Sequence, residues 1–283
     1  MAGVTIATAP LPTTPDVAAA PPGEVRRNRL WPILIVLAGV TYFLLPLAAT
    51  FWWSLRAVRD QLSFRAYQLI LSDPVAIRAF TESVVNAVAA IFVSLLIIVP
   101  TAYWVTLRVP KMRPVIEFIT LLPFVIPAVV LVFGLIRLYS RPPLLFTSTY
   151  GSTRVLLICA YAALSFPYMY RSVDNGLRAI DVRSLTEAAQ SLGASWRTII
   201  GRVIFPNLRV ALLSGSLLTF AIVIGELTVA LYMGQHTFAP YMSDLVRQKV
   251  YEPAALTIVA FGITWAAMGG ISFATRSRNR IKR

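Results

Sequence analysis

Six long apolar segments, separated by more polar connections, constrain this chain more than any other feature of its sequence. They cover residues 31–53, 84–107, 115–137, 154–173, 209–232 and 255–275. A helix needs about 20 apolar residues to cross a bilayer, and each segment is long enough. Prolines occur inside several segments, and membrane helices accept proline where neighbouring groups satisfy the freed carbonyls. The sequence therefore predicts an all-α membrane protein with six transmembrane helices.

The composition agrees with a membrane protein. Of the 283 residues, 57% are hydrophobic and 13% are charged, whereas a soluble domain averages about 25% charged residues. A net charge of +14 would suggest nucleic-acid binding in a soluble chain. In a membrane protein, basic residues instead mark the cytoplasmic connections. The expected surroundings are therefore a lipid bilayer, and no nucleic-acid partner is expected.

Lysine and arginine are distributed unevenly along the chain. They gather before the first apolar segment, between the second and third, between the fourth and fifth, and after the sixth. Because cytoplasmic connections carry the excess of basic residues, both termini are predicted to be cytoplasmic. Residues 1–24, rich in alanine, proline and threonine, are expected to form a disordered tail. Residues 276–283 are expected to form a basic cytoplasmic tail.

The largest predicted cytoplasmic connection, residues 174–208, carries helical signals of its own. Asp181 or Ser184 can cap a first helix, and the stretch from Ser184 to Glu187 fits the S-x-x-E capping box. Gly193 has the position of a residue that ends a helix with a positive φ angle. Small side chains near the middle of this helix, at Ala188 and Ala189, are predicted to form an exposed ridge.

A second helix in this connection is predicted to begin near Ser195 and to end at Pro206. Five apolar residues recur at helical spacing and predict one apolar stripe: Trp196, Ile199, Ile200, Val203 and Ile204. The connection is therefore predicted to be a helix–turn–helix that docks into a groove of a partner protein. The alternative is an amphipathic helix that rests on lipid headgroups.

This connection resembles the E-A-A-x₃-G-x₉-I-x-L-P loop in permease subunits of binding-protein-dependent ABC importers. The matching residues are Glu187, Ala188, Ala189, Gly193 and Pro206, with Val203 and Phe205 in place of isoleucine and leucine. Two further patterns are similar to type I permeases: Ser83-x-x-Asn86-Ala87 and Leu122-Pro123-x-x-x-Pro127. The resemblance covers about residues 80–275, and residues 25–53 look like the extra N-terminal transmembrane helix of this family.

The resemblance implies a type I importer permease fold in the bacterial inner membrane, with residues 80–275 as the permease core. It implies two cytoplasmic ATPase subunits, a second and different permease subunit, and an extracytoplasmic solute-binding protein as partners. The loop would be a coupling helix in a cleft of an ATPase, where Glu187 would meet a basic residue. The residues expected at this contact are Glu187, Ala188, Ala189, Gly193, Trp196, Arg197 and Pro206.

The sequence contains no motif for a catalytic activity of its own. A phosphate-binding loop needs G-x-x-x-x-G-K-[ST], and no lysine in the chain follows a glycine. His236 is the only histidine, and no metal-ligand or catalytic set surrounds it in the sequence. The prediction is a transport subunit without a cofactor, in a complex that hydrolyses ATP through other subunits.

Three polar residues in the apolar segments are candidates for the translocation path: Glu226, Thr228 and Asn86. A charged group inside a bilayer costs several kcal/mol unless it faces a cavity or a partner. The alternative for Glu226 is pairing with a polar group inside the helix bundle. The alternative for Asn86 is a hydrogen bond between helices. A carboxylate in the path would suit a cationic substrate.

The stretch that begins with Ser191-Leu192-Gly193 lacks the aspartate that sugar-transporting relatives often carry before the glycine. It looks more like the branch that handles polyamines, ferric iron, phosphonates, sulfate or thiamine. Within that branch a spermidine/putrescine-type permease is the main prediction, and ferric iron, phosphonate, sulfate or another small solute is the alternative. A secondary transporter without an ATPase is the alternative from a different class, but its usual inverted repeats are not evident here.

Overall fold

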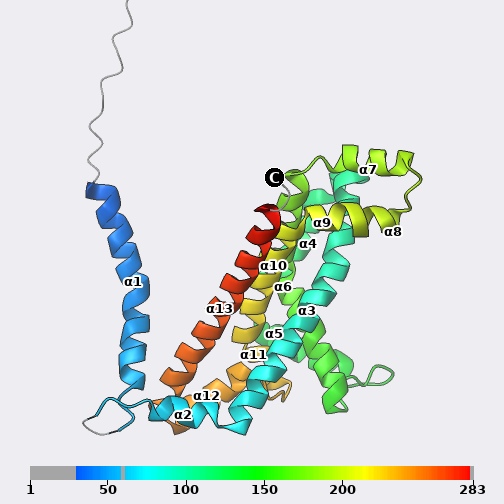
Figure 1. Ribbon diagram of the computed structural model, residues 1–283. Coiled ribbons are helices and arrows are strands. Elements are labelled where there is room, and N and C mark those ends of the chain that lie inside the picture. Colours follow the sequence, from blue (N-terminus) through cyan, green and yellow to red (C-terminus); the bar gives the residue numbers. More distant parts are fainter. Residues whose placement is uncertain (1–29, 59–60, 281–283) are drawn as a thin grey trace, which may run out of the picture. The chain divides into compact units, whose positions relative to one another are not determined.

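The computed structural model describes residues 30–58 and 61–280, and all regular elements within these residues are helices (Figure 1). In chain order they are α1 (Leu30–Ser54), α2 (Arg65–Leu71), α3 (Pro74–Leu107), η1 (Pro110–Met112), α4 (Arg113–Val125), α5 (Ala128–Tyr139), α6 (Tyr150–Arg178), α7 (Val182–Ser191), α8 (Trp196–Thr198), η2 (Ile199–Ile204), α9 (Phe205–Asn207), α10 (Arg209–Gly225), α11 (Thr228–Tyr232), α12 (Phe238–Gln248) and α13 (Glu252–Arg280). The chain divides into two units, Met1–Pro46 and Leu47–Arg283. The packing described below belongs to the second unit, and the predicted tail 1–24 lies outside the described residues.

Three helices in the described residues are long and apolar enough to cross a membrane: Trp31–Ser54, Pro74–Leu107 and Tyr150–Arg178. Two further candidates are helix pairs bent at a short break, and counting each pair as one span gives up to five. The last predicted segment, 255–275, lies within the single helix α13, of which the described stretch Glu252–Ala266 is apolar but shorter than a span. The predicted count of six spans is therefore not confirmed, because hydropathy finds apolar segments without showing whether each is one continuous helix.

The third and fifth predicted segments are both broken. Between α4 and α5 the chain bends by 97°, and Ile126 has the extended backbone expected of a residue that precedes a proline. The fifth predicted segment, 209–232, divides into α10 and α11 at Glu226, which is also extended. The two short helices beyond these breaks pack together, since α11 contacts α5 and the rings of Phe133 and Tyr232 lie 5.0 Å apart.

Helices α3, α6 and α10 pack side by side at the centre of the second unit (Figure 1). Part of their contact is built from small buried side chains such as Ala87, Ala90 and Ala160. Such residues let helix backbones approach closely in membrane proteins. At the end of these helices that carries α7, larger side chains such as Ile98 and Tyr170 form a second buried cluster. This second cluster supports the loop that contains α7, α8, η2 and α9.

Helix α12 is tied to the start of α3 by one carboxylate. Asp73 caps α3, because its Oδ1 accepts a hydrogen bond of 2.9 Å from the Val75 amide. Its Oδ2 accepts a hydrogen bond of 2.6 Å from the Tyr241 hydroxyl. The hydrogen bond from Tyr241 is the largest influence on this carboxyl and holds the pKa of Asp73 below its ordinary value. The start of α3 and the first turn of α12 are therefore held together.

Helix α6 approaches the start of α10 closely at Gly176. A Cβ atom at this position would lie 2.5 Å from the Cβ of Ala211 and 2.9 Å from Cδ2 of Leu208. Both distances are shorter than van der Waals contact, and the Ala211 Cβ is fixed to the backbone. Even the smallest side chain at Gly176 would push the two helices apart.

We therefore expect Gly176→Ala to lower the thermal stability of the purified protein. Overpacking of this kind costs about 1–3 kcal/mol. The matched control is Gly151→Ala in the same helix, because a Cβ there meets no atom within 4 Å. Thermal unfolding of both variants in the same detergent is the measurement. Equal melting temperatures for the two variants would contradict the close approach at Gly176.

Candidate functional site

Helix α7 begins at Asp181. The Oδ1 atom of Asp181 accepts a hydrogen bond of 3.1 Å from the Ser184 amide, and its Oδ2 accepts one of 2.6 Å from the Ser184 hydroxyl. Hydrogen bonding from the Ser184 side chain is the main reason why the pKa of Asp181 is lowered. Of the two predicted caps, Asp181 is therefore the one used. The predicted capping box from Ser184 to Glu187 is wrong, because the helix starts earlier and Glu187 lies beyond its first turn.

Gly193 ends α7 as predicted, with a φ of +77°. Its amide donates to the Gln190 carbonyl at 2.8 Å, and the Ala194 amide donates to the Ala189 carbonyl at 3.0 Å. These two bonds form the Schellman motif, which satisfies carbonyls that the end of a helix leaves unpaired. The neighbouring Leu192 is 89% exposed. The turn therefore projects an apolar side chain that no part of the second unit covers.

The second half of the loop is one continuous helical stretch, Trp196–Asn207, close to the predicted bounds, but its middle is wider than an α-helix. Ser195 caps α8, and the chain then widens into the π-helical segment η2 before α9. Pro206 lies one residue before the end of this stretch at Asn207, so the predicted end of the helix is off by one residue. The chain bends after α9, and the stretch Trp196–Asn207 meets α10 at an angle of 79°. The turn into α10 is therefore at Leu208.

The predicted apolar stripe is present except for its first member. Ile199 and Ile204 are buried, and Ile200 and Val203 pack partly against the same cluster. Trp196, the first residue of this helical stretch, is 53% exposed. Arg197 is exposed as well. Both side chains remain open to a partner.

The small-residue ridge on α7 is narrower than predicted. Ala188 is exposed, but Ala189 is buried in the chain's own core cluster. The Tyr103 hydroxyl lies 3.1 Å from the Thr186 hydroxyl, which joins the end of α3 to the buried side of α7. Ala189 therefore has little surface left for a partner, and packing against an ATPase stays a prediction for Ala188. Ala189 instead helps to hold α7 on the permease.

Glu187 lines a cavity of about 270 Å³ between α7, α8 and the end of α3. Arg108, Arg183 and Trp196 line the same cavity. Glu187 is exposed and forms no ion pair with any residue of the described ranges. Arg108 and Arg183 could not be predicted for this site, because nothing in the sequence shows that they share a cavity with Glu187. The carboxylate is therefore available to a basic group from outside the chain.

Glu226 is bound to the backbone at the break between α10 and α11. Its carboxylate accepts hydrogen bonds from the amides of Thr228 at 3.0 Å and Val229 at 2.9 Å. A helix start leaves such amides without partners, so Glu226 acts as the cap of α11. This arrangement is close to the predicted alternative, pairing with a polar group inside the helix bundle, with backbone amides as the partners. A role of Glu226 in the translocation path stays a prediction. Thr228 contributes its amide to the same turn.

Asn86 lies elsewhere, buried between α3 and α6. Its Oδ1 accepts a hydrogen bond of 2.8 Å from Nε of Arg154, and Nη2 of Arg154 lies 2.8 Å from Oε2 of Glu82. The alternative of a hydrogen bond between helices is therefore confirmed for Asn86. Within residues 30–58 and 61–280, no three histidine, cysteine, aspartate or glutamate side chains form a group that could hold a metal ion.

Two substitutions separate the capping role of Glu226 from a role of its charge. We expect Glu226→Ala to destabilise the protein by about 1 kcal/mol, the ordinary effect of losing a helix cap. Glu226→Gln keeps an oxygen acceptor and should lose less stability and little uptake. Thermal unfolding and uptake by both variants are the measurements. If Glu226→Gln and Glu226→Ala lost the same amount of uptake, the negative charge of Glu226 itself would be required for transport.

Comparisons with known proteins agree with the arrangement of these helices. Residues 98–275 match the family described as "Binding-protein-dependent transport system inner membrane component". The "Probable molybdenum ABC transporter permease protein" of Haloferax volcanii is 30% identical over 208 residues, which are 72% of this chain and 74% of the relative. The "Probable sulfate transport system permease protein cysT" of Chlorokybus atmophyticus is 36% identical over 209 residues, 70% of each chain.

A solved structure has the same fold. It is the "Crystal structure of a bacterial ABC transporter involved in the import of the acidic polysaccharide alginate", and it matches with a TM-score of 0.62. The match covers 91% of this chain and 99% of that chain. Its sequence identity is 18%, so this likeness shows the fold alone.

Proposed function

We propose that the substrate of this chain is a tetrahedral oxyanion such as molybdate or sulfate. The chain belongs to the family of binding-protein-dependent transport system inner membrane components, and it is a permease subunit of an ABC importer. The observation that carries this proposal is the pair of relatives named for molybdenum and sulfate transport, each aligned over 70% or more of this chain. The predicted polyamine branch receives no support from these relatives. The sulfate alternative fits them better.

The contacts of Glu226 agree with this change of substrate class. In the sequence, a carboxylate in the path would suit a cationic substrate, in addition to the resemblance of the loop to the polyamine branch. Because two backbone amides bind the Glu226 carboxylate at 3.0 Å and 2.9 Å, its charge is already offset within the chain. Glu226 therefore gives no reason to prefer a polyamine over an anion.

The loop from α7 to α9 is proposed as the contact with a cytoplasmic ATPase subunit. It presents Glu187, Ala188, Leu192 and Trp196 as exposed side chains on a frame held by Gly193 and the buried isoleucines. An unpaired carboxylate beside exposed apolar side chains suits docking into a cleft with a basic residue. Two ATPases, a second permease and an extracytoplasmic binding protein complete the proposed complex, with both termini of this chain in the cytoplasm.

Uptake by the assembled importer tests the substrate. The chain is expressed with its ATPase, partner permease and binding protein in cells that lack their own sulfate and molybdate importers. We expect uptake of radiolabelled molybdate or sulfate that stops when the ATPase is inactivated. Spermidine is the control substrate and is not expected to accumulate. Uptake of spermidine without either anion would instead support the polyamine prediction.

A further inference from the structure

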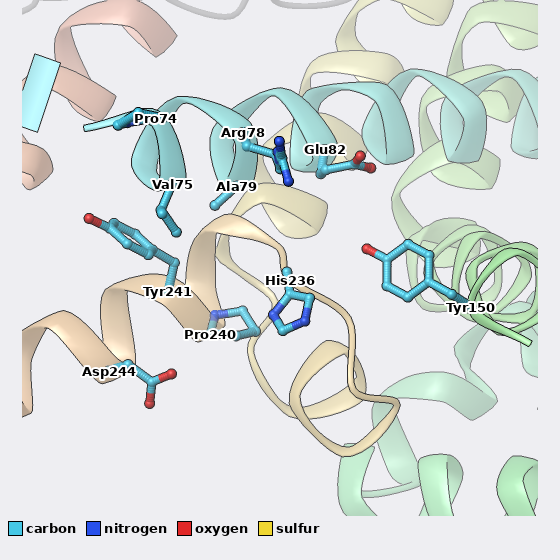
Figure 2. Close-up of a pocket in the computed structure, with 10 residues that line it drawn as sticks. All are labelled: Pro74, Val75, Arg78, Ala79, Glu82, Tyr150, His236, Pro240, Tyr241 and Asp244. Carbon is cyan, nitrogen blue, oxygen red and sulfur yellow. The ribbon is translucent and has the colours of Figure 1, made fainter. Parts of the chain in front are cut away.

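A cavity of about 650 Å³ lies where the first turns of α3 face α12 and the start of α6 (Figure 2). It is separate from the loop around Glu187 and does not include Glu226. Its polar lining includes Arg78 and Glu82 from α3, Tyr150 from α6, and His236 from the turn before α12. None of these four residues has a role in the proposed coupling contact.

Three side chains that can donate hydrogen bonds line this cavity: Arg78, His236 and Tyr150. Figure 2 shows the Tyr150 hydroxyl on the side that faces Arg78, with His236 between α3 and α12 next to them. Arg78 is exposed and has no carboxylate partner among the described residues. Its positive charge and its planar set of N–H groups are therefore available to a ligand. A guanidinium can give two parallel hydrogen bonds to one oxyanion.

The acidic side chains of the cavity do not neutralise the positive charge of Arg78 where it faces the cavity. Glu82 lies close to Arg78 in the helix, but its carboxylate is paired with Arg154 at 2.8 Å. Asp244 lies at the end of the cavity opposite Tyr150 (Figure 2). The space between Arg78, His236 and Tyr150 therefore combines donors with a positive charge.

The turn that carries His236 is held in place on both sides. Gly234 has a φ of +64°, and its amide donates to the Leu231 carbonyl at 3.1 Å to close the end of α11. On the other side, the Phe238 amide donates to the Ser83 hydroxyl at 2.8 Å. The His236 ring is stacked near the ring of Tyr150, with centroids 6.4 Å apart. Donors held by such contacts bind an anion with less reorganisation.

We propose that this cavity is an oxyanion-binding site on the permease itself, which receives molybdate or sulfate through Arg78, His236 and Tyr150. The class of anion rests on the proposed function. The site itself rests on the three donors that line one cavity and on the ion pair that occupies Glu82. Arg78 would supply the charge, and the other two residues would orient the remaining oxygens.

Equilibrium binding of radiolabelled molybdate and sulfate to the purified importer, without its binding protein, tests this site. We expect Arg78→Gln to weaken anion binding roughly 10- to 100-fold, the usual effect of losing a hydrogen bond to a charged group. Arg78→Lys keeps the positive charge but loses the planar set of N–H groups. Its affinity for the anion should lie between that of the wild type and that of Arg78→Gln. The matched control is Arg247→Gln, an exposed arginine of α12 that does not line the cavity.

The possible results distinguish the site from the substrate proposal. Equal affinities for the wild type and Arg78→Gln would overturn the site. Absence of anion binding by a wild-type permease that still imports the anion with its binding protein would also overturn it, but would leave the proposed function intact. If the complete wild-type importer neither bound nor imported molybdate or sulfate, the proposed function would fail and this site would fail with it.

Discussion

Replacing Gly193 with valine is expected to abolish ATP-driven uptake while the protein remains inserted in the membrane. Gly193 has a φ of +77°, a conformation that costs an L-residue about 1–2 kcal/mol and is still less favourable for a β-branched side chain. A Cβ there meets no atom within 4 Å, so the effect comes from the backbone and not from a clash. Valine would open the Schellman turn and change the direction of α8 relative to α7.

Gly201→Val provides the matched control. Gly201 lies in the same loop, also meets no atom within 4 Å when a Cβ is added, and does not have a positive φ. Uptake, together with the amount of protein in the membrane fraction, is the measurement. Asparagine tolerates this backbone conformation better than valine, so Gly193→Asn should retain more uptake. Normal uptake by Gly193→Val would remove the turn from the coupling mechanism.

The features of the loop that could be predicted from the sequence are those set by local chemistry. Gly193 ends α7 because few other residues adopt a positive φ at low cost. Asp181 caps α7 because its short carboxylate reaches the amides of the next turn. These interactions involve neighbours in the sequence, so the residue types themselves predict where α7 starts and ends. The choice between Asp181 and Ser184 needed the structure, because both can cap a helix.

The breaks in the membrane helices were harder to predict. Hydropathy sums the apolar character of a segment and is unchanged when the segment bends. A signal was present at Pro127, since the residue before a proline avoids helical backbone, but proline is also tolerated within membrane helices. At Glu226 the polar side chain was noticed, yet its use as a cap for α11 depends on the break itself.

Contacts between distant segments could not be predicted at all. Glu187 shares its cavity with Arg108 from the region of α3, and Ala189 is buried by side chains from other helices. The cavity around Arg78 likewise combines α3, α6 and the turn before α12. These groups meet because the helices pack together, and periodicity within one helix does not show which neighbour it will have.

Reversing the charge of Glu187 is expected to separate the permease from its ATPase. Glu187 is exposed, lacks an ion-pair partner among the described residues, and shares its cavity with Arg108 and Arg183. Glu187→Arg would therefore remove the negative charge offered to the ATPase and place a third positive charge in this cavity. Like charges at a contact cost several kcal/mol, so the docked complex should be largely lost.

Recovery of the ATPase with the tagged permease after mild solubilisation measures this effect. Glu187→Gln removes the charge without reversing it and should weaken the complex less than Glu187→Arg. Arg202→Glu is the control, because it changes the charge by the same amount at an exposed position in the same loop that does not line the cavity. If Glu187→Arg retained as much ATPase as the control, α7 would not be the charged contact. The loop would then fit better as a helix on the membrane surface, where the exposed Trp196 and Arg197 could meet lipid headgroups.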